Sequence, residues 1–248
     1  MLKNFFGYVI DPLNGVRLFT WHHYMLIGLA LVAIFAPLRY SERIYQSKNE
    51  ERYRNIAFWW LLSLEIIYHA HNWIAGRELS LPLHICSFAV IMSLALLKTN
   101  SKQVFEYVFF FGVLGGLMAL LVPFSYGFPY YNIRYWHFIL IHMTIIMIPL
   151  YYFKAYGHRV TLRATYKTFI MVVLVMPVIY NINLLLRRLS NTTSVNYWFV
   201  TDIPENVQMI FSNHLIYIAV LISVLYVSQL LLYKISNRNN ELENNHES

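Results

Sequence analysis

One cysteine and several histidines lie in otherwise apolar stretches, and these are the residues of the chain that could do chemistry. Cys86 is the single cysteine of the sequence, and His137 and His142 lie together in a later apolar stretch. A thiolate close to a helix N-terminus is a good nucleophile, and a neighbouring imidazole can act as its base. The pattern is typical of a thioester-forming site with Cys86 as the nucleophile and His142 or His137 as the base.

The two histidines of the later stretch cannot both serve such a site. In a regular helix their side chains point about 140° apart, and His137 instead shares a face with Thr144. His142 lies deeper in the apolar stretch and is the favoured base. Just before the cysteine, His84 is about 200° from Cys86 in a regular helix, although Pro82 permits an irregular start where both could reach one cavity.

A second group of polar residues is spaced to share one face of a helix. Glu65, His69 and Asn72 lie at positions i, i+4 and i+7, whereas His71 points elsewhere. No lysine or arginine lies in the same apolar stretch as Glu65. We therefore expect Glu65 to be protonated, to pair with a histidine of another helix, or to bind a cation.

Three other interpretations of these residues stay open. Three imidazoles, with or without Glu65, could bind zinc for lipid hydrolysis, but the sequence has no HExxH or HxxxH motif, so we assign no metal or other cofactor. The polar residues could instead line an outer cavity for an anionic or zwitterionic small molecule in a transporter or binding protein. They could also only join helices, with Cys86 as a small apolar filler. The predicted polar pocket contains Glu65, His69, Asn72, His84, Asn181 and His214.

The elements that must position these residues are membrane-spanning helices. Hydrophobic residues make up 58% of the 248 residues and charged ones only 12%, too few to solvate a globular domain of this length. Long apolar stretches recur along the chain and predict an all-α, polytopic transmembrane bundle of about seven spans. The predicted spans are 21–37, 56–75, 82–97, 104–122, 135–153, 165–186 and 213–233.

The distribution of basic residues predicts the orientation of the bundle. Most of the 19 Lys and Arg residues fall in alternate loops and the C-terminal tail, which places the N-terminus outside and the C-terminus inside. Most of the ten histidines then fall in the outer half of the membrane, together with Cys86. This topology explains the net charge of +7 without a nucleic-acid partner. The predicted organisation is an interfacial segment (1–20), a single membrane domain (21–236) and a polar cytoplasmic tail (237–248).

Small residues in one span predict a close helix contact. Gly112 and Gly116 form a small-xxx-small pair in the span 104–122. Such pairs let the backbone of a neighbouring helix approach closely. We assign this face to helix packing.

The segment Leu81-Pro82-Leu83-His84-Ile85-Cys86 resembles the YwaF-type bacterial integral membrane proteins, which are related to the eukaryotic transmembrane protein 164 family. The segments 69–73 and 135–142 look like further parts of the same pattern. The resemblance implies a multi-pass protein of the bacterial plasma membrane whose partner is membrane lipid. It also implies transfer of acyl chains between phospholipids, with Cys86 as the nucleophile. Because one fold supports many functions, we keep lipid acyltransferase or hydrolase as the expectation.

Overall fold

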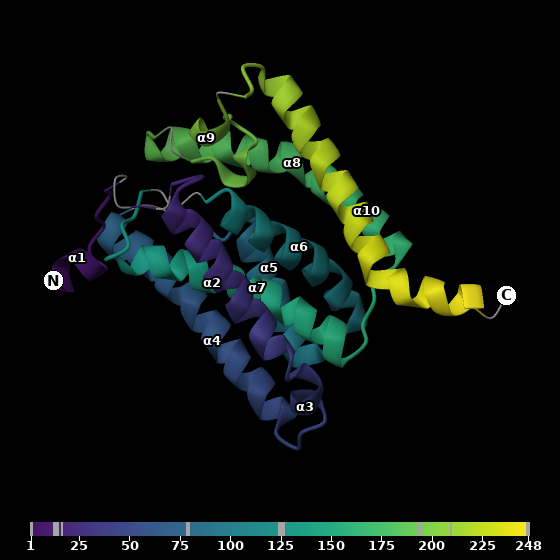
Figure 1. Cartoon of the computed structure of the whole chain (residues 1–248). Helices are drawn as coiled ribbons and strands as arrows, with labels where there is room; N and C mark the ends of the chain where they lie inside the picture. The colour runs from purple at the N-terminus through teal and green to yellow at the C-terminus, as the bar shows by residue number, and fades with distance from the viewer. Residues whose placement is uncertain are drawn as a thin grey trace. The chain divides into compact units, whose positions relative to one another are not determined.

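The computed structural model is helical and contains no strand in the residues that it describes, which confirms the all-α prediction. The described residues fall into two compact units (Figure 1). The first unit comprises Met1–Pro82 and Cys86–His158, and the second comprises Leu83–Ile85 and Arg159–Ser248. The described residues are 2–11, 15, 17–77, 80–123, 127–192, 195–208 and 210–246.

Helix α7 is the centre of the first unit, where it contacts α2, α3, α4 and α6 (Figure 1). A Cβ atom at Gly112 would collide with the carbonyl of Ile145, and one at Gly116 would lie 2.5 Å from Ile146 Cγ1. Only glycine lets α6 approach α7 this closely, so the predicted packing role of the pair is confirmed. The helices of this unit are α1 (Leu2–Phe6), α2 (Trp21–Leu38), α3 (Ser41–Tyr45), α4 (Glu50–His71), the π-helical turn η1 (Asn72–Gly76), α5 (Ile85–Thr99), α6 (Lys102–Leu121) and α7 (Ile133–Ala155).

Polar side chains join α4 and α7 as an antiparallel pair. In the middle of α4, Trp60 Nε1 donates to Thr144 Oγ1 over 3.1 Å. Further along, His137 Nε2 bonds the carbonyl of Leu64 over 2.9 Å. These contacts fix the register of the two helices that carry most of the candidate site residues.

The N-terminal segment is attached to the beginning of α7. Asn132 is completely buried, and its side-chain amide donates to the carbonyls of Asn4 and Gly7 over 2.9 and 2.7 Å. The same side chain accepts from the backbone N–H of Arg134 and thus caps the helix. One side chain therefore both starts α7 and holds the segment before α2.

The opposite end of α7 is held by a carboxylate of α4. Glu50 accepts two bonds from Arg54 Nε, at 2.8 and 2.9 Å, and one from the hydroxyl of Tyr156 at 2.7 Å. Tyr151 donates to the same carboxylate over 3.3 Å. Both ends of α7 are thus tied to other parts of the first unit by buried or half-buried polar groups.

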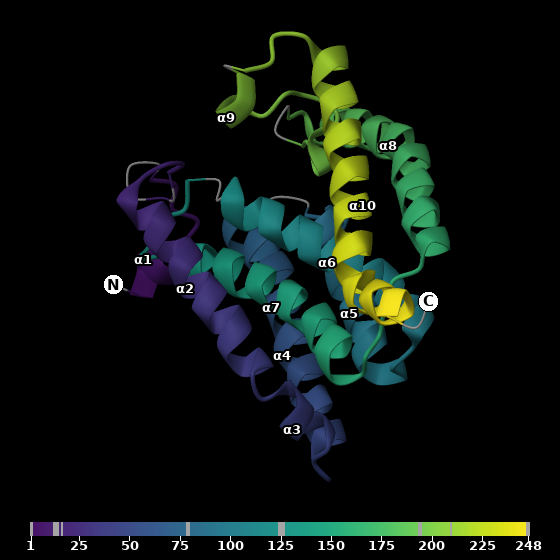
Figure 2. The same ribbon diagram turned by 45° about the vertical axis from the view of Figure 1, so that its right-hand side comes forward.

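The second unit is built on two long helices that pack against each other, α8 and α10 (Figure 2). The segment that connects these two helices folds back onto α8. Asn183 of α8 donates to the carbonyl of Tyr197 and to Thr201 Oγ1, both in this segment. Trp198 donates to the carbonyl of Leu83 within this unit. The elements are α8 (Leu162–Ser190), the 3-10 turn η2 (Tyr197–Phe199), α9 (Glu205–Gln208) and α10 (His214–His246).

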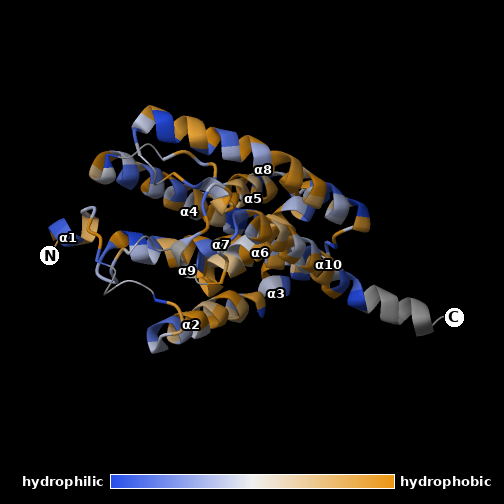
Figure 3. Cartoon of the chain, turned by 90° about the horizontal axis from the view of Figure 1, so that it is seen from above, coloured by the Kyte–Doolittle hydropathy of each residue, from blue (hydrophilic) through white to orange (hydrophobic). Residues whose placement is uncertain are grey.

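Five helices in the described part of the chain are long and apolar enough to cross a membrane, namely α2, α6, α7, α8 and α10. Hydrophobic residues cover much of these helices (Figure 3). Each predicted span coincides with a helix, but α5 is a shorter apolar helix and α4 begins with charged turns. The chain is therefore a multi-pass integral membrane protein, while the count of seven spans and the orientation stay predictions.

Candidate functional site

Cys86 and His142 face each other across α5 and α7. Cys86 Sγ lies 3.2 Å from His142 Nε2, within hydrogen-bonding distance for sulfur. The cysteine is in the first turn of α5 and is half-buried, whereas His142 lies inside α7 with 6% of its surface exposed. The structure thus brings together the sequence-predicted nucleophile and the favoured one of its two predicted bases.

The second ring nitrogen of His142 fixes which tautomer faces the thiol. Nδ1 lies 2.6 Å from the carbonyl of Phe138, and a carbonyl oxygen can only accept a hydrogen bond. Nδ1 therefore carries the proton, and the lone pair of Nε2 points at Cys86. In this arrangement the thiol donates to the imidazole, which is the geometry required of a general base.

The backbone around His142 is fixed by the close contact between α6 and α7. A Cβ atom at Gly116 would lie 3.0 Å from the carbonyl of His142, so the two helices touch at the base itself. The ring of Phe138 packs against the imidazole, with 4.5 Å between ring centres. Glycine spacing in α6 thus sets the position of a side chain that faces α5.

Glu65 and His69 form a second pair close to the first. His69 Nε2 lies 3.2 Å from Glu65 Oε1, and His69 Nδ1 lies 3.1 Å from the carbonyl of Ser80. One of the three alternatives for Glu65 was a pair with a histidine of another helix, but its partner is His69 of its own helix, because the i, i+4 spacing already places the two together. Glu65 also interacts electrostatically with Cys86 and His142, which connects the two pairs.

The remaining predicted base, His137, points to a different helix. Its Nε2 bonds Leu64 of α4, and its ring lies 5.4 Å from that of Tyr68. Thr144, predicted to share its face, also contacts α4. The two histidines of α7 thus point in different directions, as their helical phase predicted. His137 bonds α4, and His142 contacts Cys86.

Two further polar residues of the first unit lie at the end of α4. Asn72 is buried in η1 with 4% of its surface exposed. His71 points away from the Glu65 stripe, as predicted, and its ring stacks on that of Tyr8.

The other predicted pocket residues belong to the second unit. His84 precedes α5, and its ring packs against those of Tyr197 and Phe199. Asn181 is exposed and bonds the carbonyl of Pro177 in its own helix, while His214 bonds the carbonyl of Val200. The structure gives each of these residues a partner within its own unit.

Residues 18–233 match the sequence profile of the TMEM164 family, which covers most of the chain and all the site residues above. The chain belongs to the TMEM164 family. This agrees with the resemblance to the transmembrane protein 164 family, whereas the YwaF-type bacterial branch stays a prediction. Searches of curated proteins and of solved structures found no match.

The described part of this TMEM164-family chain does not assemble a metal site. No three His, Cys, Asp or Glu side chains there are grouped so that they could hold a metal ion. The polar groups occur instead as the two pairs described above, Cys86 with His142 and Glu65 with His69. The ligand geometry that the zinc hypothesis needs is therefore not preformed in these residues.

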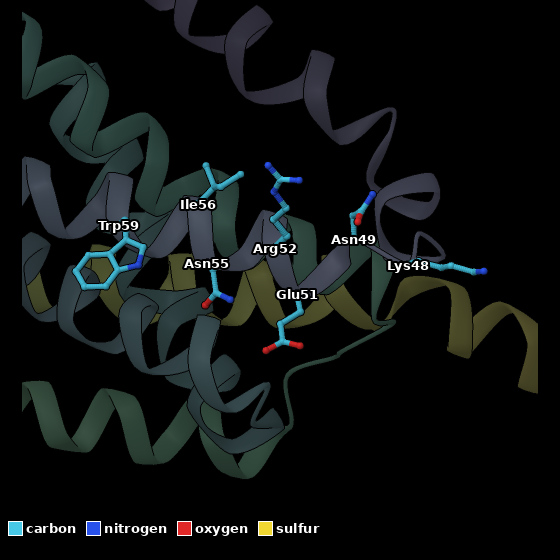
Figure 4. A pocket seen from close by; sticks show the side chains of 7 residues that line it. All are labelled: Lys48, Asn49, Glu51, Arg52, Asn55, Ile56 and Trp59. Atoms are coloured by element: carbon cyan, nitrogen blue, oxygen red, sulfur yellow. The ribbon is translucent and has the colours of Figure 1, made fainter.

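A hollow of about 560 Å³ lies at the first turns of α4 (Figure 4). Ten residues separate Asn55 in this hollow from Glu65, or about 15 Å along a helix. The hollow is open, and it contains neither a histidine nor the cysteine. Its lining residues are Lys48, Asn49, Glu51, Arg52, Asn55, Ile56 and Trp59.

Arg134 was not singled out from the sequence, where it counted only as one of the outer basic residues. In the structure it lies in the first turn of α7 with 7% of its surface exposed. Its guanidinium lies 4.1 Å from the centre of the Tyr68 ring. The available signal was its place one turn before His137 in an apolar helix, where a charge is costly.

Proposed function

We propose that this TMEM164-family protein is a membrane-embedded enzyme that moves acyl chains of lipids through a thioester on Cys86. The supporting observation is the 3.2 Å contact between Cys86 Sγ and His142 Nε2. The bond from His142 Nδ1 to Phe138 makes Nε2 the acceptor. A thiol filler needs no such oriented base, so the contact favours chemistry over packing.

In the first half of the reaction, His142 Nε2 takes the proton of the Cys86 thiol. The thiolate attacks the carbonyl carbon of a lipid ester, and a carbon–sulfur bond forms. The ester carbon–oxygen bond then breaks, and the leaving alkoxide takes the proton from His142 Nε2. The lipid leaves with a free hydroxyl, and its acyl chain stays on Cys86 as a thioester.

In the second half, a hydroxyl of an acceptor lipid gives its proton to His142 Nε2 and attacks the thioester. The carbon–sulfur bond breaks, and the sulfur recovers the proton from the imidazole. Water in place of the acceptor would give hydrolysis, so the same residues support a transferase or a hydrolase. The deep burial of His142 favours transfer because it limits the access of water.

Glu65 and His69 would support the charge that forms during this cycle. When His142 takes the thiol proton it becomes an imidazolium, and Glu65 is close enough to interact with it electrostatically. An ionised Glu65, with the proton of its pair on His69, stabilises the transient imidazolium of His142. Glu65 thus acts through His142 and is a positioning residue.

The experiment is direct detection of the acyl-enzyme. The full chain is reconstituted in nanodiscs with a fluorescent diacyl phospholipid, and intact mass spectrometry follows a hydroxylamine-labile acyl adduct. We expect the adduct on the wild-type chain and none on Cys86→Ala. In His142→Gln the rate of adduct formation should fall by about 10²-fold or more, the usual effect of losing a general base.

His137→Gln is the matched control, because it changes the same residue type on the same helix. It should keep the adduct, since His137 contacts Leu64 rather than the cysteine. Acyl transfer that persists unchanged in Cys86→Ala would refute the proposal. Tight lipid binding without any adduct or bond cleavage would favour the alternative of a non-enzymatic binding or transport protein.

A further inference from the structure

Arg134 carries a buried positive charge that its neighbours leave largely unsatisfied. A guanidinium has five N–H donors. Its Nε is buried without a hydrogen-bond partner, and Nη1 reaches the carbonyl of Tyr68 only at 3.5 Å, the outer limit for such a bond. The rings of Tyr68 and Phe128 flank it, at 4.1 and 5.3 Å from the centroids.

No carboxylate neutralises this charge within the described part of the chain. The ion pairs found there join Arg54 to Glu50, His69 to Glu65 and Arg187 to Asp202. Taking an arginine out of water without an anion is costly. Aromatic faces recover only a part of that cost. Among the described residues, the Arg134 guanidinium therefore has no anionic partner.

The position of Arg134 relates it to the Cys/His pair. Arg134 and His142 are eight residues apart on α7, which corresponds to about 12 Å along the axis and about 80° around it. Both residues also interact electrostatically with His137, which lies between them in sequence. The guanidinium and the catalytic imidazole are thus on the same half of one helix, two turns apart.

We propose that Arg134 binds the phosphate of a glycerophospholipid whose ester lies at Cys86, an assignment that rests on the proposed acyl transfer. The two positions on α7 are about 12 Å apart along the axis, which is of the same order as the length of a glycerophospholipid from its phosphate to its glycerol esters. Neutral glycerides lack the group that Arg134 needs.

The backbone at this place also favours an anion. Arg134 is in the first turn of α7, where unpaired backbone N–H groups and the helix dipole attract negative charge. Arginine matches phosphate oxygens with two parallel bonds, which a lysine cannot do. The buried, unpartnered guanidinium carries the assignment, and the helix end adds to it.

The test compares two lipids that differ only in the headgroup. Full-length Cys86→Ala, which cannot turn lipid over, is released from micelles for native mass spectrometry with equal amounts of dioleoyl phosphatidylglycerol and dioleoylglycerol. We expect at least a tenfold preference for the phospholipid. Arg134→Gln in the same background should abolish the preference, and Arg134→Lys should retain only part of it.

Arg77→Gln is the matched control, because Arg77 is an exposed arginine on the same predicted side of the membrane. It should leave the preference intact. An equal affinity of Cys86→Ala for both lipids, or an unchanged preference in Arg134→Gln, would overturn the inference. If Arg134→Gln does not fold, two results still test the inference. They are the lipid preference of Cys86→Ala itself and the weaker preference expected of Arg134→Lys.

A competition arm separates a lipid headgroup from free phosphate. Equimolar inorganic phosphate should not displace phosphatidylglycerol, and displacement would overturn the lipid assignment. Binding is measured without turnover, so it is independent of the reaction. A phospholipid preference without a Cys86 adduct in the wild-type chain would refute the enzyme alone, whereas an adduct without any Arg134-dependent preference would refute the headgroup site alone.

Discussion

His69 connects Glu65 to the backbone of Ser80 through its two ring nitrogens, at 3.2 and 3.1 Å. Because the carbonyl of Ser80 only accepts, Nδ1 must carry a proton. The contact between Nε2 and Glu65 then requires one more proton, on either the carboxyl or the imidazole. The pair carries no net charge in either form.

Replacing Glu65 should separate the charge of this pair from its geometry. In Glu65→Gln the amide can still donate to His69 Nε2, but the group that supports the His142 imidazolium is lost. We expect acyl-enzyme formation to fall about tenfold, which corresponds to about 1.4 kcal/mol. The melting temperature should change little. The rate is measured by adduct formation and the stability by thermal unfolding in detergent.

Glu65→Ala and Glu51→Gln complete the comparison. Glu65→Ala removes the hydrogen bond as well and should lower both the rate and the melting temperature. Glu51 is an exposed acid of the same helix, so Glu51→Gln should affect neither. A wild-type rate in both Glu65 variants would contradict a supporting role of this carboxylate.

The packing of α6 against α7 predicts a strong effect of a single methyl group. In Gly116→Ala the new Cβ would lie 2.5 Å from Ile146 Cγ1 and 3.0 Å from the carbonyl of His142. The helices must separate, which we expect to destabilise the protein by about 1–3 kcal/mol and to disturb the contact between His142 and Cys86. Thermal unfolding and the rate of Cys86 acylation report the two effects.

Gly28→Ala is the matched control in α2, because a Cβ there meets no described atom within 4 Å. Alanine favours a helix over glycine by up to about 1 kcal/mol, so this variant should be as stable as the wild type or more so. Equal stability of the two alanine variants would show that the helices do not need this close approach.

Local spacing predicted several parts of the site correctly. The i, i+4 spacing put His69 beside Glu65, and the 140° between His137 and His142 assigned them to different neighbours. The glycine pair of α6 was assigned to packing for the right reason. These features depend on the geometry of a single helix, which the sequence determines directly.

Features that depend on which helices are neighbours could not be predicted in the same way. The sequence does not show that His137 would bond the carbonyl of Leu64 and that His142 would contact Cys86. The local sequence of α7 does not specify which helices pack against it. Arg134 counted only as one of the outer basic residues, and its burial involves Tyr68, which lies 66 residues away in the sequence, as well as the nearby Phe128. His84 is only two residues from Cys86, yet it belongs to the other compact unit, where its ring packs against those of Tyr197 and Phe199.

Asn132 should be essential for attaching the N-terminal segment. Asn132→Ala removes the cap of α7 and both bonds to the carbonyls of Asn4 and Gly7. A lost cap alone costs about 1 kcal/mol, and the two further bonds add to it. We expect a lower melting temperature and faster cleavage by trypsin at Lys3 and Arg17.

Asn132→Asp distinguishes the two roles of this side chain. A carboxylate can still cap α7 by accepting from the N–H of Arg134, but it cannot donate to the two carbonyls. In this variant trypsin should therefore cleave the N-terminal segment faster than in the wild type, although α7 stays intact. Cleavage at the wild-type rate in both variants would mean that other contacts hold this segment.

The bond from Tyr156 to Glu50 predicts how stability changes at alkaline pH. Tyr156 follows the last turn of α7, and burial, its bond to Glu50 and the charge of Glu50 raise the pKa of its hydroxyl. A raised pKa in the folded state stabilises the protein below the unfolded pKa of about 10. This contribution is lost as the pH rises above about 10 toward the folded-state value. The free energy of unfolding should therefore decline over that range.

Tyr156→Phe removes both the bond and the titrating group. At neutral pH the variant should be less stable by about 1.5–3 kcal/mol, the usual contribution of a hydrogen bond to a charged group. Above about pH 10 its stability should fall less steeply than that of the wild type, so the two curves converge.

Tyr53→Phe, at an exposed tyrosine of α4, serves as the control and should follow the wild-type curve. Denaturant unfolding between pH 8 and 11 measures the difference, and parallel curves for Tyr156→Phe and the wild type would show that Tyr156 is not protonated more tightly in the folded protein.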